Sequence, residues 1–189
     1  MTSEKISGLV IRALKCAINF DDVGETEGLV NRNRSKNFVE QLGGQFSLHY
    51  EKNENVRVLT KHNGENRPEF GLNELLFDVL VCEVSTVPSA TTQKDITFVA
   101  KGLWAVESEM AKNSREAMYD FNKLVLSSSE NLLFVGPLVS DNESFIAPIE
   151  RAAQHCSKPA YIVLIPHPST WGQLDGITET DLFVRQLNQ

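Results

Sequence analysis

Cysteine is scarce in this sequence, and the few cysteines lie far apart. Of 189 residues only three are cysteine, Cys16, Cys82 and Cys156, and no Cys-x-x-Cys pair occurs. An odd number of isolated cysteines argues against a disulfide scaffold and against a structural zinc site. A reducing cytoplasm is therefore the expected location. Cys82 lies in an apolar segment, so we expect it to be a small core residue.

Long hydrophobic runs are also missing. No apolar stretch approaches the roughly 20 residues that span a membrane, so we expect no membrane association. Residues 1–20 show apolar periodicity, but Glu4, Arg12 and Lys15 interrupt it. The segment lacks the uninterrupted apolar centre and the small-residue cleavage site of a signal peptide. We interpret it as an amphipathic helix.

The common motifs of nucleotide-binding and serine-nucleophile proteins are absent. The sequence has no P-loop and no Gly-x-Gly-x-x-Gly, so a nucleotide cofactor is not indicated. Ser127–Ser129 lack the glycine context of a nucleophile elbow. His155 and Cys156 are adjacent near a predicted helix end, where they would not converge on one ion. His62 and His167 fall in predicted loops or turns.

Positive charge is in deficit, with 18 Lys and Arg against 25 Asp and Glu and a net charge of −7. This balance counts against a protein that coats nucleic acid through bulk positive charge. It does not count against an enzyme with an acidic metal site and a local basic rim. The candidates for such a rim are Arg32, Arg34, Lys101, Lys112 and Arg115. For Arg32, Arg34 and Lys36 the simpler alternative is a solvated helix face.

The first half of the sequence predicts helices followed by strands. The composition, 41% apolar and 23% charged, is ordinary for a globular protein, and no linker or repeat divides residues 1–189. We therefore expect a single domain. Apolar periodicity predicts helices over 4–19 and about 25–42, the second ending at Gly43 and Gly44. Alternation predicts a strand over 46–50, and 56–59 is a short strand or a loop edge.

The second half alternates strands and helices. Apolar runs predict strands at 75–82, 98–109, 132–135 and 161–165, with helices at 111–126 and 145–156 and a polar connection over 85–95. The residues TETDLFVRQL near the end are a last strand or a short helix. A β-α-β-α-β order over 96–165 predicts parallel strands covered by helices on both faces. The expected fold is α/β with a mixed central sheet.

The strand predicted over 98–109 ends in two acids. Residues 103–106 are apolar without a break, which is typical of a central strand. Glu107 and Glu109 are separated by one residue, so in a strand they point to the same face. Such a pair repels unless a cation or a proton is shared. The alternatives are a strand end in solvent, or the first turn of a helix, where acids are favourable.

A third acid, Asp78, interrupts the apolar run LLFDVLV. A carboxylate there is costly without a partner, and the alternatives are an exposed edge or a buried ion pair. Adjacent strands lie about 5 Å apart, so in the right register Asp78, Glu107 and Glu109 would converge. Mg²⁺ (or Mn²⁺) favours such oxygen ligands. A metal held this way can activate water against a phosphodiester.

With these residues in place, the sequence resembles the PD-(D/E)xK, or restriction-endonuclease-like, nuclease superfamily. The likeness consists of a helix, Asp78 on one strand, Glu107-Ser108-Glu109 on the next, and the helix over 111–126. It covers roughly residues 25–165, a range that overlaps the N-terminal helices over 4–42 and is followed by an extension over 166–189. The resemblance implies a metal-dependent nuclease, with DNA as the expected substrate.

The sequence departs from the family pattern at two positions. Phe77 replaces the usual proline before the aspartate, and Glu109 replaces the usual lysine. Some members use Glu-x-Glu, and in others the lysine has migrated onto the following helix, which makes Lys123 a candidate replacement. Its simpler role is an i,i+3 pair with Asp120. The resemblance also makes Glu40 a possible further acid near the metal, with a solvated helix surface as the alternative.

A non-catalytic function on the same fold is the other hypothesis. An acidic protein could bind a basic protein partner, as an immunity protein or an accessory subunit does, or form a homodimer. The net charge of −7 and the missing lysine favour this hypothesis. A nuclease should bring a basic rim close to the three acids, whereas a binding protein should keep Asp78 apart from the two glutamates.

Overall fold

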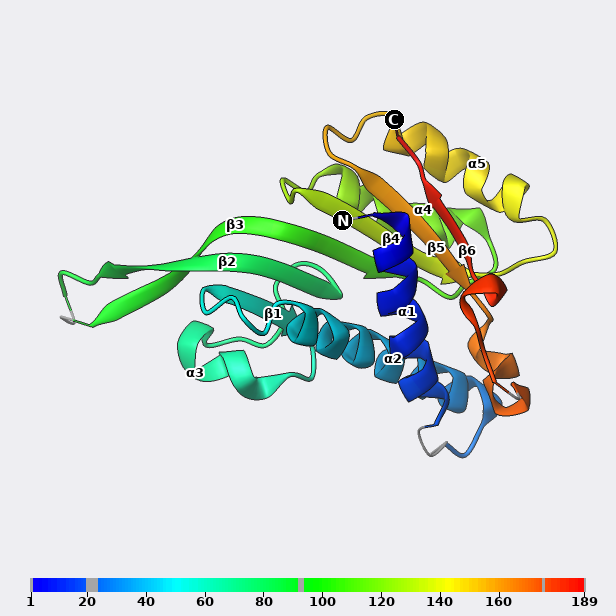
Figure 1. Cartoon of the computed structure of the whole chain (residues 1–189), viewed down its shortest axis with the longest axis horizontal. Helices are drawn as coiled ribbons and strands as arrows, with labels where there is room; N and C mark the ends of the chain where they lie inside the picture. Colours follow the sequence, from blue (N-terminus) through cyan, green and yellow to red (C-terminus); the bar gives the residue numbers. More distant parts are fainter. Residues whose placement is uncertain (1, 20–23, 92–93, 175, 189) are drawn as a thin grey trace.

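The centre of the fold is a mixed sheet with helices on both of its faces (Figure 1). The computed structural model describes residues 2–19, 24–91, 94–174 and 176–188. Within these ranges six strands form one sheet in the order β1-β2-β3-β4-β5-β6. The predicted class, α/β with a mixed central sheet, is confirmed.

The strands follow one another across the sheet in chain order. The strands are β1 (Val56–Thr60), β2 (Val79–Pro88), β3 (Asp95–Ser108), β4 (Asn131–Pro137), β5 (Ala160–Ile165) and β6 (Phe183–Gln186). The helices are α1 (Ser3–Ile18), α2 (Glu27–His49), α3 (Arg67–Phe70), α4 (Ser114–Val125) and α5 (Asn142–Ala153), with short 3₁₀ turns η1 (Gly64–Asn66), η2 (Pro168–Gln173) and η3 (Glu179–Asp181). β1, β2 and β3 form an antiparallel meander. β3, β4 and β5 are parallel, and β6 returns antiparallel to β5.

Two apolar clusters lie on opposite faces of the sheet. On one face, α1 and α2 pack against Trp104 and Val106 of β3. On the other face, α4 and α5 pack against Ala105 of the same strand. Successive strand residues point to opposite faces, so Glu107 continues the row of Ala105 and points to the side of α4.

Helix α2 is longer than the sequence predicts, and the predicted strand over 46–50 is wrong. The helix runs through Gly43 and Gly44 to His49. Leu42 and Phe46, one helical turn apart, are both buried in the α1–α2 cluster. A Cβ on Gly43 would lie 2.5 Å from the Thr60 methyl carbon. The glycine therefore permits close helix–strand packing and does not cap the helix.

Strands β2 and β3 form a ribbon that extends well beyond the region predicted to be strand. Much of the predicted polar connection over 85–95 is paired in a register that places Val87 opposite Ile96. Figure 1 shows this β2–β3 arm, which comprises residues 84–88 and 95–99, projecting from the body of the molecule. Its one serine and two threonines suit a solvent-exposed ribbon, so the polarity of this segment does not indicate a loop.

One edge of the sheet collects the segments that carry the predicted site. β1 ends at this edge and β2 begins there, while β3, β4 and β5 all end at it. We call it the carboxyl edge. In open α/β sheets, ligands bind preferentially outside the carboxyl ends of the parallel strands. In the described part of the chain, no helix is long and apolar enough to cross a membrane.

Candidate functional site

Asp78 and Glu107 come together at the carboxyl edge. Val79 of β2 pairs with Val106 of β3, so Asp78 and Glu107 lie one step beyond this pair. The Ser108 backbone N–H donates a hydrogen bond of 2.9 Å to Asp78 Oδ2. Asp78 is half-buried, and the Glu107 side chain is 1% exposed. Two of the predicted site acids are therefore adjacent, as the antiparallel pairing requires.

Lys123 reaches the same place from helix α4. Its Nζ lies 3.0 Å from Glu107 Oε2 and 2.8 Å from Asp120 Oδ1. The lysine thus makes the i,i+3 pair predicted along the helix and, in addition, contacts the strand acid Glu107. Its predicted role as a replacement for the usual lysine stays a prediction. We call Asp78, Glu107, Asp120 and Lys123 the carboxyl-edge cluster. Asp120 was expected only as a helix partner of Lys123.

Both acids of the strand pair hold their protons more tightly than usual. Burial raises the pKa of Asp78 to about 6, against the opposing effects of the Ser108 N–H and of Lys123. Burial, and then the charge of Asp78, raises the pKa of Glu107 to about 8, although Lys123 opposes this. Two carboxyl groups this close do not ionise independently. Raised carboxyl pKa values at a sheet edge mark a candidate functional site.

Lys123 keeps its positive charge in this environment. Burial alone would lower the pKa of its ammonium group, but hydrogen bonds to Asp120 and Glu107 outweigh burial and raise the pKa above its usual range. Lys123 is therefore a fixed cation at neutral pH. It can neutralise Glu107 or attract an anion, but it cannot accept a proton.

One atom of the cluster has no partner. Glu107 Oε1 is buried, and the described residues offer it no hydrogen bond. A buried carboxyl oxygen without a hydrogen-bond partner is expensive, whether the group is ionised or protonated, unless an ion or a ligand contacts it. Mg²⁺ commonly takes one or two carboxylates and completes its shell with water and phosphate oxygens. Asp78 and Glu107 are a donor set that fits such an ion.

Glu109 does not join this pair. It lies just past the end of β3, where its N–H donates 3.0 Å to the carbonyl of Val135 and its Oε1 accepts 2.6 Å from the N–H of Ala111. Across the described ranges, no three His, Cys, Asp or Glu side chains are grouped so that they could hold a metal ion. A role for Glu109 as the third metal ligand stays a prediction, and this geometry gives it no support.

Glu40 is engaged at the end of β1. Its carboxylate accepts hydrogen bonds from the Thr60 hydroxyl and, at 3.0 Å, from the His62 N–H. These bonds fasten helix α2 to the segment that follows β1. Glu40 therefore has a structural task, and its predicted role as a further acid near the metal stays untested.

Four of the five residues proposed as a basic rim, all but Arg32, interact with groups outside the carboxyl-edge cluster. Arg34 donates 2.6 Å to the carbonyl of Pro168, and Lys101 pairs with Glu130. Arg115 donates to the Tyr119 hydroxyl. Lys112 lies near His167 and, after burial, contributes to lowering the pKa of that imidazole. Lys123, in contrast, contacts one of the two strand acids, Glu107.

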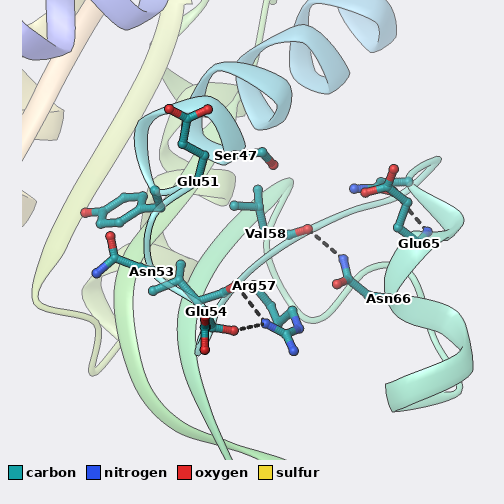
Figure 2. Close-up of a pocket in the computed structure, with 11 residues that line it drawn as sticks. Ser47, Glu51, Asn53, Glu54, Arg57, Val58, Glu65 and Asn66 are labelled. Atoms are coloured by element: carbon teal, nitrogen blue, oxygen red, sulfur yellow. Dashed lines mark hydrogen bonds between the residues drawn. The ribbon is translucent and has the colours of Figure 1, made fainter.

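A polar cavity of about 260 Å³ lies away from the carboxyl-edge cluster, between the end of α2, strand β1 and η1 (Figure 2). Inside it, Asn66 donates 2.7 Å to the Val58 carbonyl and Arg57 donates 2.7 Å to the Glu54 carbonyl. Arg57 also pairs with Glu69 at 2.7 Å. These contacts hold η1 and α3 against strand β1. Because the polar groups already have partners of this kind, we propose no catalytic or binding role for the cavity.

Comparison with family models, with curated protein sequences and with solved structures finds no match to this chain. The resemblance to restriction-endonuclease-like nucleases thus depends on the order of elements and on the site residues alone.

The contact between Lys123 and Glu107 predicts a pH-dependent stability effect. We expect Lys123→Met to destabilise the protein by about 2 kcal/mol at pH 9, where Glu107 is charged and would lose its partner. A fully buried pair would cost about 3–5 kcal/mol, but Lys123 is 48% exposed. The loss should be smaller at pH 6, because Glu107 is then protonated in the folded protein. Urea unfolding at both pH values measures it.

The matched control is Lys101→Met. Lys101 and Glu130 form an ion pair with both side chains about half-exposed, and such pairs contribute little. Equal stability of the two variants at pH 9 would show that Lys123 does not support the charge of Glu107.

Proposed function

We propose that this protein is a metal-dependent nuclease of restriction-endonuclease-like fold, and that it hydrolyses phosphodiester bonds, with DNA as the expected substrate. The observation that carries the proposal is the buried carboxylate of Glu107. It lies beside Asp78 at the carboxyl edge, with one oxygen unpartnered and a charged lysine on the other.

The strand order supports the proposed fold. Helix α2 precedes the antiparallel meander β1-β2-β3, and α4 then leads to β4, which is parallel to β3. Asp78 adjoins the second strand of this meander and Glu107 lies near the end of the third. This is the order of elements on which the resemblance was based.

Asp78 and Glu107 would hold Mg²⁺ or Mn²⁺. When bound, such an ion would supply Lewis-acid activation of water and neutralise charge on a phosphate. The protein's own groups contribute orientation and charge. Ser108 N–H fixes one oxygen of Asp78, and Lys123 places a fixed cation beside Glu107. Because Lys123 stays protonated, it would attract the anionic substrate and would not act as the base.

The proposal predicts loss of activity in Asp78→Asn. The amide oxygen can still accept the Ser108 hydrogen bond, so the fold should persist, but the anionic ligand is removed. We expect wild type to cleave DNA with Mg²⁺ or Mn²⁺ and the variant to be slower by roughly 100-fold or more. Calorimetry should show metal binding by wild type that weakens or disappears in the variant.

Glu83→Gln is the matched control, because Glu83 is an exposed acid on β2, the strand that Asp78 adjoins. It should keep wild-type activity and metal binding. Cleavage by Asp78→Asn at the wild-type rate would refute the assignment of the site. Absence of both cleavage and metal binding in wild type would refute the proposed function.

One observation favours the non-catalytic alternative, a protein that binds a protein partner. One face of the β2–β3 arm carries three exposed apolar side chains, Val87, Ile96 and Phe98. Clustered apolar groups on an exposed ribbon are typical of protein-binding surfaces. If wild type neither cleaves nucleic acid nor binds metal, the arm is where a protein contact should be sought.

A further inference from the structure

A leucine next to the carboxyl-edge cluster has an unusual backbone and an unusual exposure. Leu76 has φ of +66°, and the Phe77 N–H donates 2.8 Å to the Leu75 carbonyl, closing a three-residue γ-turn. Its side chain is 76% exposed. Among the described residues it is the one non-glycine position with positive φ.

This conformation is unfavourable for leucine. A γ-turn with positive φ at its centre is rare and strained, and glycine adopts it with far less strain. Strain of this kind persists where the surrounding structure enforces it, and it is concentrated at functional sites. The feature at Leu76 therefore calls for an explanation.

The neighbours of Leu76 show what the turn accomplishes. Phe77 is buried in the cluster packed by α4 and α5, and Leu75 packs against the same cluster. The turn lets residues on both sides of Leu76 enter the core while Leu76 itself points outward. Burial of Leu76 does not contribute to the fold, so a polar residue or glycine would serve the fold at least as well.

The position of Leu76 connects it with the proposed chemistry. It lies two residues before Asp78, and a chain segment of that length spans at most about 7 Å. Asn73, in the same loop, donates 3.2 Å to the Lys61 carbonyl and so joins the loop to the segment after β1. A phosphate bound through a metal ion at Asp78 and Glu107 would place its nearest nucleotide within reach of the Leu76 side chain.

We propose that Leu76 contacts the nucleotide next to the scissile phosphate and inserts against its base as an apolar wedge. The inference rests on the proposed nuclease function. In a nucleic acid, apolar surface is concentrated on the faces of the bases, and exposed leucines of DNA-binding proteins use it by partly unstacking a base step. A strained and rigid turn holds the side chain outward, which lowers the ordering cost of such a contact.

Leu76→Ala and Leu76→Gly test this inference on the full chain. The probe is a DNA duplex with 2-aminopurine at the bases flanking the cleavage site, bound in Ca²⁺ and cleaved in Mg²⁺. Wild-type binding should raise the fluorescence, as unstacking requires. Both variants should lose most of this rise and bind roughly five- to tenfold more weakly. Leu76→Gly should be at least as stable as wild type, because it relieves the strain.

Leu48→Ala is the control, because Leu48 is an exposed leucine on helix α2. It should behave as wild type. If wild type cleaves the duplex and the Leu76 variants match it in affinity and fluorescence, the wedge is refuted and the nuclease proposal stands. A wild type that neither binds nor cleaves DNA overturns both. A change in oligomeric state without an effect on DNA binding would assign Leu76 to self-association and refute the wedge.

Discussion

Replacing Trp104 with alanine is expected to destabilise the protein by about 4 kcal/mol, near the upper end for core truncations. Trp104 is 1% exposed and lies on β3 under helix α2. Its ring packs against Phe46 and Tyr161, at centroid distances of 5.7 and 6.1 Å. Its Nε1–H donates 3.2 Å to the Tyr50 hydroxyl. Alanine would lose these contacts and leave a large cavity.

Two further variants separate the contributions to this loss. Trp104→Phe keeps much of the aromatic packing and should cost less than half as much. Tyr50→Phe removes only the acceptor of the indole N–H and should cost about 1 kcal/mol. Urea unfolding at one pH measures all three. If Trp104→Ala loses less than Tyr50→Phe, then Trp104 is not the packing centre of this face.

Glu107→Gln is expected to remove a pH dependence of stability that wild type shows between about pH 4.5 and 8. In the unfolded chain the carboxyl ionises near its ordinary pKa of 4.5, whereas in the folded protein the pKa is about 8. Between these values the folded state binds more protons than the unfolded state. The free energy of unfolding therefore falls as pH rises, by at most about 1.4 kcal/mol per pH unit from this group.

The stabilisation from Glu107 is complete below its unfolded pKa and is lost as pH rises through the folded pKa. Asp78 adds a dependence of the same sign between 3.8 and about 6, which the variant should retain in part. Chemical denaturation in EDTA from pH 4 to 9 measures both slopes. Glu83→Gln, at an exposed position, should keep the wild-type profile. A Glu107→Gln profile parallel to that of wild type would contradict the raised pKa.

The sequence predicted the buried parts of the fold best. Three strands predicted from apolar runs, β3, β4 and β5, lie close to their predicted ranges. The same holds for three helices predicted from apolar periodicity, α1, α4 and α5. The prediction of a strand over 46–50 was wrong because the alternation there competes with the i,i+4 spacing of Leu42 and Phe46, and packing of these two residues in the core favours the helix. The β2–β3 arm was not predicted because an exposed ribbon needs no apolar pattern.

The part of the site that depends on pairing between β2 and β3 could be predicted from the sequence. The part that depends on where β3 ends, or on how α4 packs against it, could not. Asp78 and Glu107 follow from an antiparallel register between two recognisable strands. Glu109 was expected to point with Glu107, but β3 ends at Ser108, so strand alternation no longer governs it. The dual contact of Lys123 requires the distance between α4 and β3, which spacing along one helix cannot give.

The β2–β3 ribbon also determines when the two acids meet during folding. At its tip Pro88 pairs with Asp95, seven positions away, whereas at its root Val79 pairs with Val106, 27 positions away. The entropy lost in closing a loop grows with its length, which favours pairing at the tip before the root. Asp78 and Glu107 lie beyond the last strand pair, Val79 and Val106, so their mutual repulsion arises late, after the rest of the ribbon has formed. The two carboxyl groups are thus kept apart until the rest of the ribbon can hold them together.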